Sequence, residues 1–244
     1  MIPLIFAVVG AYLISDSFKP KSYARGGSVQ LLAPNGKPSN LTPKQWYLVR
    51  TPAFKKWFGD WENDAKNASK IVDENGEPLI VYHGTTKDFF IFDRKFAGKQ
   101  TKVDWGELGF FFTDNRSLAE DFTRNKWSLG EKSKIKKGSK LLSCFLSISN
   151  PEIVNARQWV LEHQSPTILR AELKQNSKDG YFINPLSQED RESWINIFGT
   201  KGIKELENKQ FVAFEPNQIK LADGTNTTFD GSNSDIRYAE GGNL

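Results

Sequence analysis

The stretch LIVYHGT at residues 79–85 decides how this chain is interpreted, because an apolar run ends there in a histidine that is followed directly by a glycine. The run from Leu79 to Tyr82 is typical of a buried strand. His83 then lies at the strand end, and Gly84 leaves room for a ligand to approach the backbone. A single histidine in such a place is more often a hydrogen-bonded structural residue, so its interpretation depends on the rest of the chain.

The residues on either side of this stretch predict an α+β domain over residues 67–238. The sequence KIVDENGEPLIVY at residues 70–82 is expected to form two strands joined by an Asn-Gly hairpin turn. No alternation of strands and helices indicates a βαβ unit, so we expect mixed or antiparallel sheets with helices packed at the side. Further strands are predicted at 89–92, 109–113, 141–149, 181–183 and 210–214, and helices at 117–124, 156–164 and 167–175.

Two short helices are predicted in residues 41–66, ahead of this domain. Thr42 precedes Pro43 and Gln45, which is a capping-box start. A second helix begins after Pro52 and carries closely spaced aromatic residues. Their spacing suits one apolar face, so we expect them to pack in a core and not to stack on bases. These aromatic residues are Phe54, Trp57, Phe58 and Trp61.

The ends of the chain are less informative. Residues 1–14 are apolar and uncharged, but they lack the basic start of a secretory signal and are short for a membrane span. A short membrane anchor that contacts a membrane, a signal-like segment and a helix buried in an assembly are three open interpretations. Residues 15–40 are predicted to be a linker and residues 239–244 a flexible tail. Irregular structure is also expected at 128–140, which is rich in lysine, and at 185–202.

Composition sets limits on function. The 244 residues are 38% hydrophobic and 25% charged, which is ordinary for one globular domain with appendages. The formal net charge of +4 permits an acidic or nucleotide ligand without requiring one. Cys144 is the only cysteine, so neither an internal disulfide nor a multi-cysteine metal site can form. The acidic residues lack metal-ligand spacing, and we expect no metal.

Four pieces of sequence follow one another in an informative order. They are the His83-Gly84-Thr85 strand end, the aromatic strand GFFFTDN at 109–115, the helical AEDF at 119–122, and the late strand KQFVAFEPNQI at 209–219. In this order they resemble the histidine-tyrosine-glutamate class of ADP-ribosyltransferases, the branch of diphtheria toxin and poly(ADP-ribose) polymerases. The chain is still more similar to the ADP-ribosyltransferase domain of phage polyvalent proteins. That similarity covers residues 41–238 and includes the helical preface at 41–62, residues 82–85 and 109–115, and the closing residues 229–238.

The resemblance implies a split mixed or antiparallel sheet with flanking helices, and NAD as substrate. No Rossmann-type glycine fingerprint is present, and this fold needs none. By resemblance, His83 hydrogen-bonds a ribose hydroxyl and the Gly84 backbone holds the nicotinamide carboxamide, which has one acceptor and two donors. Aromatic faces suit the flat, cationic pyridinium. The implied catalytic residues are His83, Phe111 and Gln210, and the implied NAD contacts are His83, Gly84, Thr85, Phe111, Phe112, Ala119 and Phe122.

Four positions depart from the pattern of the class. Phe111 and Phe122 keep the ring but lack the hydroxyl of the tyrosines that many relatives carry, and Ala119 stands where relatives often have a serine. Gln210 replaces a glutamate, and an amide can neither take a proton nor place negative charge beside an oxocarbenium ion. Chain elongation is therefore not expected, whereas transfer of a single unit or slow hydrolysis of the dinucleotide is compatible. The ExE pair of Glu205 and Glu207 lies before the strand and is interpreted as surface charge.

We therefore predict an NAD-dependent mono-ADP-ribosyltransferase, a phage-encoded effector that modifies a host macromolecule. It is expected to act in the host cytoplasm or in association with the virion. Two alternatives belong to other classes. One is a degenerate module that binds NAD without turnover, and the other is an effector that targets nucleic acid, for which no catalytic set is visible. The acceptor, whether protein, nucleic acid or small molecule, is not specified by the sequence.

Overall fold

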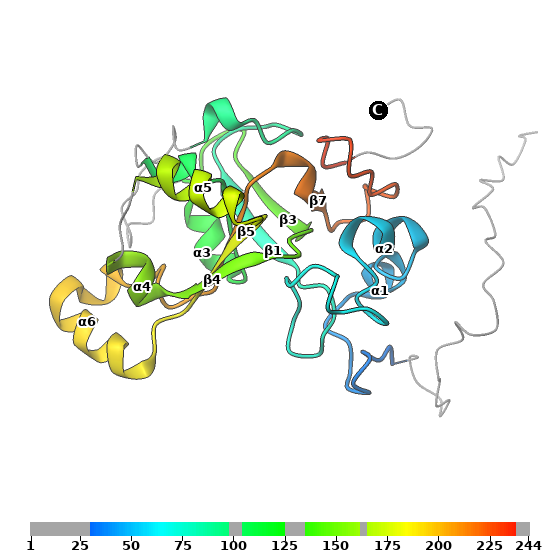
Figure 1. Ribbon diagram of the computed structural model, residues 1–244, viewed down its shortest axis with the longest axis horizontal. Helices are drawn as coiled ribbons and strands as arrows, with labels where there is room; N and C mark the ends of the chain where they lie inside the picture. Colours follow the sequence, from blue (N-terminus) through cyan, green and yellow to red (C-terminus); the bar gives the residue numbers. More distant parts are fainter. Residues whose placement is uncertain (1–29, 98–103, 125–134, 162–164, 238–244) are drawn as a thin grey trace, which may run out of the picture.

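The structure is a computed structural model that describes residues 30–97, 104–124, 135–161 and 165–237 (Figure 1). Its strands form one mixed sheet in the order β4-β5-β6-β2-β1-β3-β7, which confirms the predicted α+β class. The strands are β1 (Val81–Thr85), β2 (Phe110–Thr113), β3 (Lys140–Leu146), β4 (Pro151–Asn155), β5 (Gly180–Asn184), β6 (Gln210–Ala213) and β7 (Ile219–Leu221). The helices are α1 (Pro43–Leu48), α2 (Pro52–Phe58), α3 (Arg116–Asp121), α4 (Ala156–Leu161), α5 (Pro166–Gln175) and α6 (Gln188–Gly202), and the 3-10 turns are η2 (Arg94–Phe96), η3 (Asp104–Glu107) and η4 (Pro216–Gln218).

The sheet is split between its two central strands. Strand β1 pairs with β3 over five residue pairs, and β2 pairs with β6 over four. Between β1 and β2, by contrast, only Tyr82 and Thr113 are paired. The two strands therefore separate from His83 and Phe112 onward, as the resemblance to ADP-ribosyltransferases implied.

One edge of the sheet contains the βαβ unit that the sequence analysis did not expect. Strands β4 and β5 pair in parallel over five residue pairs, and helices α4 and α5 connect them. Strand β4 was not predicted because it begins with Pro151, which has no backbone N–H to donate. A strand tolerates proline only as its first residue or at the edge of a sheet. The strand predicted at 141–149 ends earlier, at Leu146. The next amide, that of Ser147, donates to the carbonyl of Gln218 at 2.9 Å.

Three other expectations were wrong in their detail. Residues 70–82 do contain the Asn-Gly turn, but its arms share only the bridge between Val72 and Pro78, and β1 pairs elsewhere. Residues 89–92 form no strand, because Ile91 makes a single bridge with Asp235 of the closing segment. Residues 185–202 are largely the helix α6, which bends at Gly199, where φ is 71°.

The helical preface forms as predicted and packs at the β3–β7 end of the sheet (Figure 1). Thr42 and Gln45 make the complete capping box at the start of α1. The rings of Phe54, Phe58 and Trp61 are at most 4% exposed, and Phe54 contacts Phe145 of β3 edge to face at 5.2 Å. The preface therefore belongs to the same packed body as the sheet.

The last ten residues of the predicted linker form a defined turn. Residues 31–40 form a turn bridged between Leu32 and Pro38, and it matches the turn bridged between Val72 and Pro78. The two turns lie side by side, since the amide of Asn35 donates to the Asn75 side chain at 2.9 Å. The pairing of two Asn-Gly turns was invisible in the sequence because it joins segments 40 residues apart.

Several predictions fall on residues outside the described part of the chain. These are the apolar segment 1–14, the linker up to residue 29, most of the lysine-rich segment 128–140 and the tail 239–244. In the described ranges, no helix is long and apolar enough to cross a membrane. Cys144 is buried with a free thiol, and burial raises the pKa of that thiol.

Candidate active site at the split of the sheet

His83 lies at the point where β1 and β2 separate. Its ring packs against Phe92 at 5.1 Å and against Phe112, its neighbour across the split, at 5.3 Å between ring centroids. Its Nδ1 lies 2.8 Å from the carbonyl oxygen of Phe111. This hydrogen bond joins the two strands where their backbone ladder has stopped.

The bond to Phe111 fixes the tautomer of His83. A carbonyl oxygen can only accept, so Nδ1 carries the proton and donates it. Burial lowers the pKa of His83, and the bond to the Phe111 carbonyl opposes that shift. The neutral ring therefore keeps a lone pair on Nε2, which can accept a hydrogen bond from a hydroxyl group.

Gly84 is the point at which helix α3 meets the sheet. A Cβ atom on this residue would lie 1.7 Å from the carbonyl oxygen of Ala119 and 3.0 Å from Cβ of Phe122. The backbone that approaches Gly84 closely is thus that of helix α3. The glycine is needed for this packing, which could not be predicted from the sequence. Ala119 is buried, whereas Phe122, which ends α3, is half-buried beside Gly84.

Phe111 lies across the split from Gly84. Its neighbours Phe110 and Phe112 point into the core on the other face of the sheet, because side chains alternate along a strand. The ring of Phe111 is half-buried and meets Trp159 of α4 edge to face at 6.2 Å. Trp159 was not predicted from the sequence as a neighbour of Phe111, and its ring also contacts Trp105 at 4.4 Å.

Two of the residues expected to contact NAD have side chains buried in the core. Phe112 is 2% exposed and packs in the core with Phe92, so a ligand does not reach its ring. Thr85 is 3% exposed, and its hydroxyl accepts the backbone amide of Lys87 at 3.1 Å. Both side chains point to the core face that His83 also occupies, which the alternation along the strands predicts once the register is known.

Gln210 begins β6 and lies on the same sheet face as Phe111. It pairs with Thr113, so Phe111 is its diagonal neighbour on β2, at about 7–8 Å between such residues. Its Nε2 donates to the backbone carbonyl of Glu205 at 3.1 Å. The structure therefore brings Gly84, Phe111 and Gln210 to one face, whereas the His83 ring packs on the other face against Phe92 and Phe112.

The segment before β6 is tied to both ends of α3. Asn115 at the start of the helix donates to Asn208 at 2.7 Å, and Lys204 pairs with Asp121 at the end of the helix at 2.5 Å. These contacts fix Gln210 relative to Phe122. Because they join residues more than 80 positions apart, sequence spacing could not reveal them.

The interpretation of the ExE pair as surface charge is wrong for one of its members. Glu205 is half-buried, and burial raises the pKa of its carboxyl group, with the charge of Lys204 opposing the shift. Burial also raises the pKa of Asp114, which follows Thr113, and the charge of Lys209 opposes that shift. Glu207, in contrast, forms an ion pair with Arg191. Two carboxyl groups that burial makes harder to ionise thus flank the Thr113–Gln210 pair.

Chemically, this arrangement offers a neutral imidazole acceptor, aromatic faces and an amide around a split sheet. Among the residues that the structure describes, no group of histidine, cysteine and acidic side chains could hold a metal ion. A mixed sheet divided between β1 and β2, with a His-Gly strand end on one side and an aromatic strand on the other, is consistent with the ADP-ribosyltransferase class of folds.

The comparison with protein families agrees. A sequence model described as ADP-ribosyltransferase in polyvalent proteins matches residues 73–229, and the chain belongs to this family. The match contains every site residue that the sequence analysis named. No match was found among the curated proteins.

Proposed function

We propose that this protein transfers a single ADP-ribose unit from NAD to a macromolecule of a phage host. Membership of the ADP-ribosyltransferase family supports ADP-ribosyl transfer. The observation that carries the finer proposal is the split between β1 and β2, which has the neutral ring of His83 on one face of the sheet and Gly84, Phe111 and Phe122 on the other.

In the proposed reaction, the bond between the nicotinamide nitrogen and ribose C1′ breaks, and nicotinamide leaves with the bonding electron pair. The transition state has oxocarbenium character. An oxygen or nitrogen atom of the acceptor then bonds to C1′, and its proton passes to water because the Gln210 amide cannot take it.

Each side chain has a distinct role in this proposal. His83 Nε2 accepts a hydrogen bond from a ribose hydroxyl, and Phe111 and Phe122 stack on the pyridinium. The Gly84 backbone orients the carboxamide. Gln210 orients a ribose hydroxyl or the acceptor, and without a carboxylate it does not support chain elongation.

The test is incubation of the protein with labelled NAD and host lysate, followed by mass spectrometry of the labelled species. We expect a discrete target that gains one ADP-ribose unit. His83→Ala should reduce labelling by at least about tenfold, since it removes a hydrogen bond to the reacting sugar. Equal labelling by the wild type and by a folded His83→Ala protein would refute the role given to His83.

Gln210 provides a matched pair of variants. Gln210→Glu restores a carboxylate next to the developing positive charge and should raise the rate of nicotinamide release, whereas Gln210→Ala should lower it. The two substitutions change one side chain at the start of β6, so thermal unfolding of both serves as the control for folding.

A second candidate function follows from the hydrogen bond that engages Gln210 with the Glu205 carbonyl. An amide held in this way suits a module that binds NAD without turning it over. Tight binding of NAD by calorimetry, with no nicotinamide released by either the wild type or Gln210→Glu, would favour this candidate over the transferase.

A further inference from the structure

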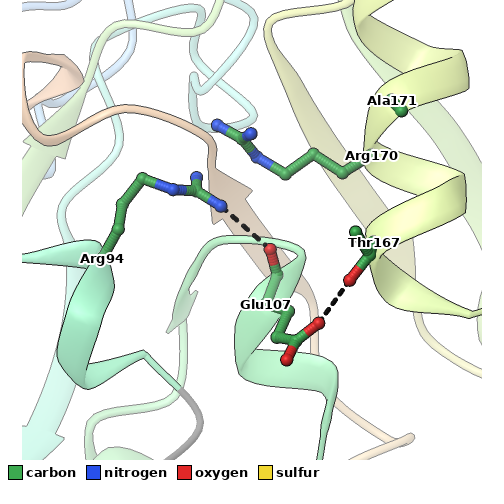
Figure 2. Close-up of a pocket in the computed structure, with 5 residues that line it drawn as sticks. All are labelled: Arg94, Glu107, Thr167, Arg170 and Ala171. Atoms are coloured by element: carbon green, nitrogen blue, oxygen red, sulfur yellow. Dashed lines mark hydrogen bonds between the residues drawn. The ribbon is translucent and has the colours of Figure 1, made fainter.

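A pocket of about 340 Å³ lies between turns η2 and η3 and helix α5. It is lined by Arg94, Glu107, Thr167, Arg170 and Ala171. Figure 2 shows the side chains of Arg94 and Arg170 extending toward the same space from opposite walls, with Glu107 below them. The pocket is distinct from the split described above, because the residues that line it lie in η2, η3 and α5 and not on strands of the sheet.

Among the residues that the structure describes, the hydrogen-bond partners of the Arg94 guanidinium are backbone carbonyls. Its guanidinium donates to the carbonyl of Phe214 at 2.8 Å and to that of Glu107 at 3.1 Å. Within the described ranges, no carboxylate lies at ion-pair distance from Arg94. Its positive charge is therefore oriented by the fold but not neutralised by a direct partner.

Arg170 has a partner but is not fully satisfied. One of its terminal nitrogens donates to the Phe214 carbonyl at 3.0 Å and to Glu215 at 2.8 Å. Its Nε is buried and has no hydrogen-bond partner in the described part of the chain. A buried donor without an acceptor is costly, and such a group calls for an explanation.

The two guanidinium groups also repel each other. Burial and then the charge of Arg94 lower the pKa of Arg170, which means that both effects oppose its charged form. The nearest acidic groups do not remove the imbalance. Glu215 is shared with Lys174, and the carboxylate of Glu107 accepts the hydroxyl of Thr167. The pocket thus gathers more positive than negative charge around an open space.

We propose that Arg94 and Arg170 form a binding site for a phosphoryl group. The planar guanidinium fork matches the oxygens of a phosphate, and it is less strongly hydrated than an ammonium group. A bound phosphoryl oxygen accepts the free Nε–H of Arg170 and lies between two positive charges that otherwise repel. The backbone carbonyls that hold Arg94 pre-organise the site, so that little side-chain entropy is lost on binding.

The position of the site admits two sources of this phosphoryl group. Arg94 lies two residues after Phe92 in the sequence. The ring of Phe92 contacts the His83 ring at 5.1 Å. Phe214, which binds both arginines, directly follows β6, the strand that Gln210 begins. The group is therefore either the diphosphate of the dinucleotide or a phosphate of the acceptor, and both share the chemistry that the arginines recognise.

The experiment measures binding of inorganic pyrophosphate to the full chain by calorimetry. Arg94→Gln should weaken binding by at least about tenfold, as expected for a lost charge-assisted hydrogen bond. Glu107→Gln should tighten binding, because it removes the negative charge in the pocket and keeps an acceptor for Thr167. Lys174→Gln is the matched control, since it removes a positive charge beside Glu215 that does not line the pocket.

The affinity for pyrophosphate is expected to fall in Arg94→Gln and to rise in Glu107→Gln. Because Glu107→Gln is measured separately, the test remains decisive even if Arg94→Gln disturbs folding. Pyrophosphate that binds equally to the wild type, Arg94→Gln and Glu107→Gln, or that does not bind the wild type, would overturn the proposal. Competition then assigns the source. Displacement of pyrophosphate by NAD supports the diphosphate, and simultaneous binding of both supports an acceptor phosphate. Because pyrophosphate binding requires no catalysis, its outcome is independent of whether the protein is a transferase.

Discussion

Arg50 in the helical preface and Arg170 on α5 differ in how fully their guanidinium groups are paired. Arg50 is 8% exposed, and its guanidinium pairs with Glu77 at 2.9 Å and with Glu62 at 3.1 Å. It also stacks over the ring of Trp46 at 3.7 Å. Arg170 shares one carboxylate with a lysine and keeps a buried Nε–H without an acceptor.

The difference separates structural from functional charge. The guanidinium of Arg50 and the carboxylates of Glu62 and Glu77 pair with one another, and these ion pairs hold the preface to the Asn-Gly turn at Glu77. Near the split and the pocket, His83 keeps a neutral ring, and Arg94 and Arg170 are incompletely neutralised. Polar groups that a fold leaves unsatisfied are candidates for contact with a ligand.

The largest effect is expected from Arg50→Ala. The substitution leaves the carboxylate of Glu77, which is 0% exposed, buried without its ion pair, and should lower the free energy of unfolding by about 3–5 kcal/mol. Chemical denaturation measures the loss. Arg157→Ala is the matched control, because its ion pair with Asp190 is exposed and should contribute less than about 1 kcal/mol. Similar losses for both variants would show that the ion pairs of Arg50 stabilise the fold no more than an exposed ion pair does.

An intermediate effect is expected from pyrophosphate. At about one hundred times its dissociation constant, the anion should raise the free energy of unfolding of the wild type by about 2.7 kcal/mol. Arg94→Gln at the same anion concentration should show little of this gain. Thermal unfolding with and without pyrophosphate measures both. A gain that persists in Arg94→Gln would place the anion elsewhere.

The smallest effect concerns pH and His83. Because its pKa in the folded protein lies below the ordinary value, the unfolded chain takes up the proton first as the pH falls. The contribution of His83 is therefore intact above about pH 6.5 and is lost as the pH falls toward the depressed pKa, by at most about 1.4 kcal/mol per pH unit. Denaturation curves between about pH 7 and pH 5 measure it, with His83→Asn as the reference. An unchanged slope in His83→Asn would assign the effect to other groups.

Much of the fold could be predicted from local patterns. The capping box at Thr42, the aromatic face of α2 and the strands around Phe111 and Gln210 are features of short stretches, and the structure contains all of them. Strand β4 and helix α6 were missed because their sequences carry weak periodicity and are held by neighbours distant in the chain. The turn at 31–40 was taken for linker for the same reason.

The candidate site shows the same division. His83, Gly84, Phe111 and Gln210 were predicted as site residues from their order, and the family match spans their positions, while their roles stay a prediction. Phe112 and Thr85 were assigned to the ligand although they serve the core, because strand register decides which face a side chain occupies. Glu205 and Trp159 were missed since nothing in their immediate sequence shows that they pack near β2 and β6.

By itself, the sequence determined the class of the fold, the family and the order of the site residues, because these depend on residue type and local spacing. The tertiary structure alone decided where the sheet splits, which helix approaches Gly84, and that Arg94 and Arg170 share one pocket without sharing a carboxylate. These features depend on contacts between residues dozens of positions apart, and such contacts are set by packing and strand register.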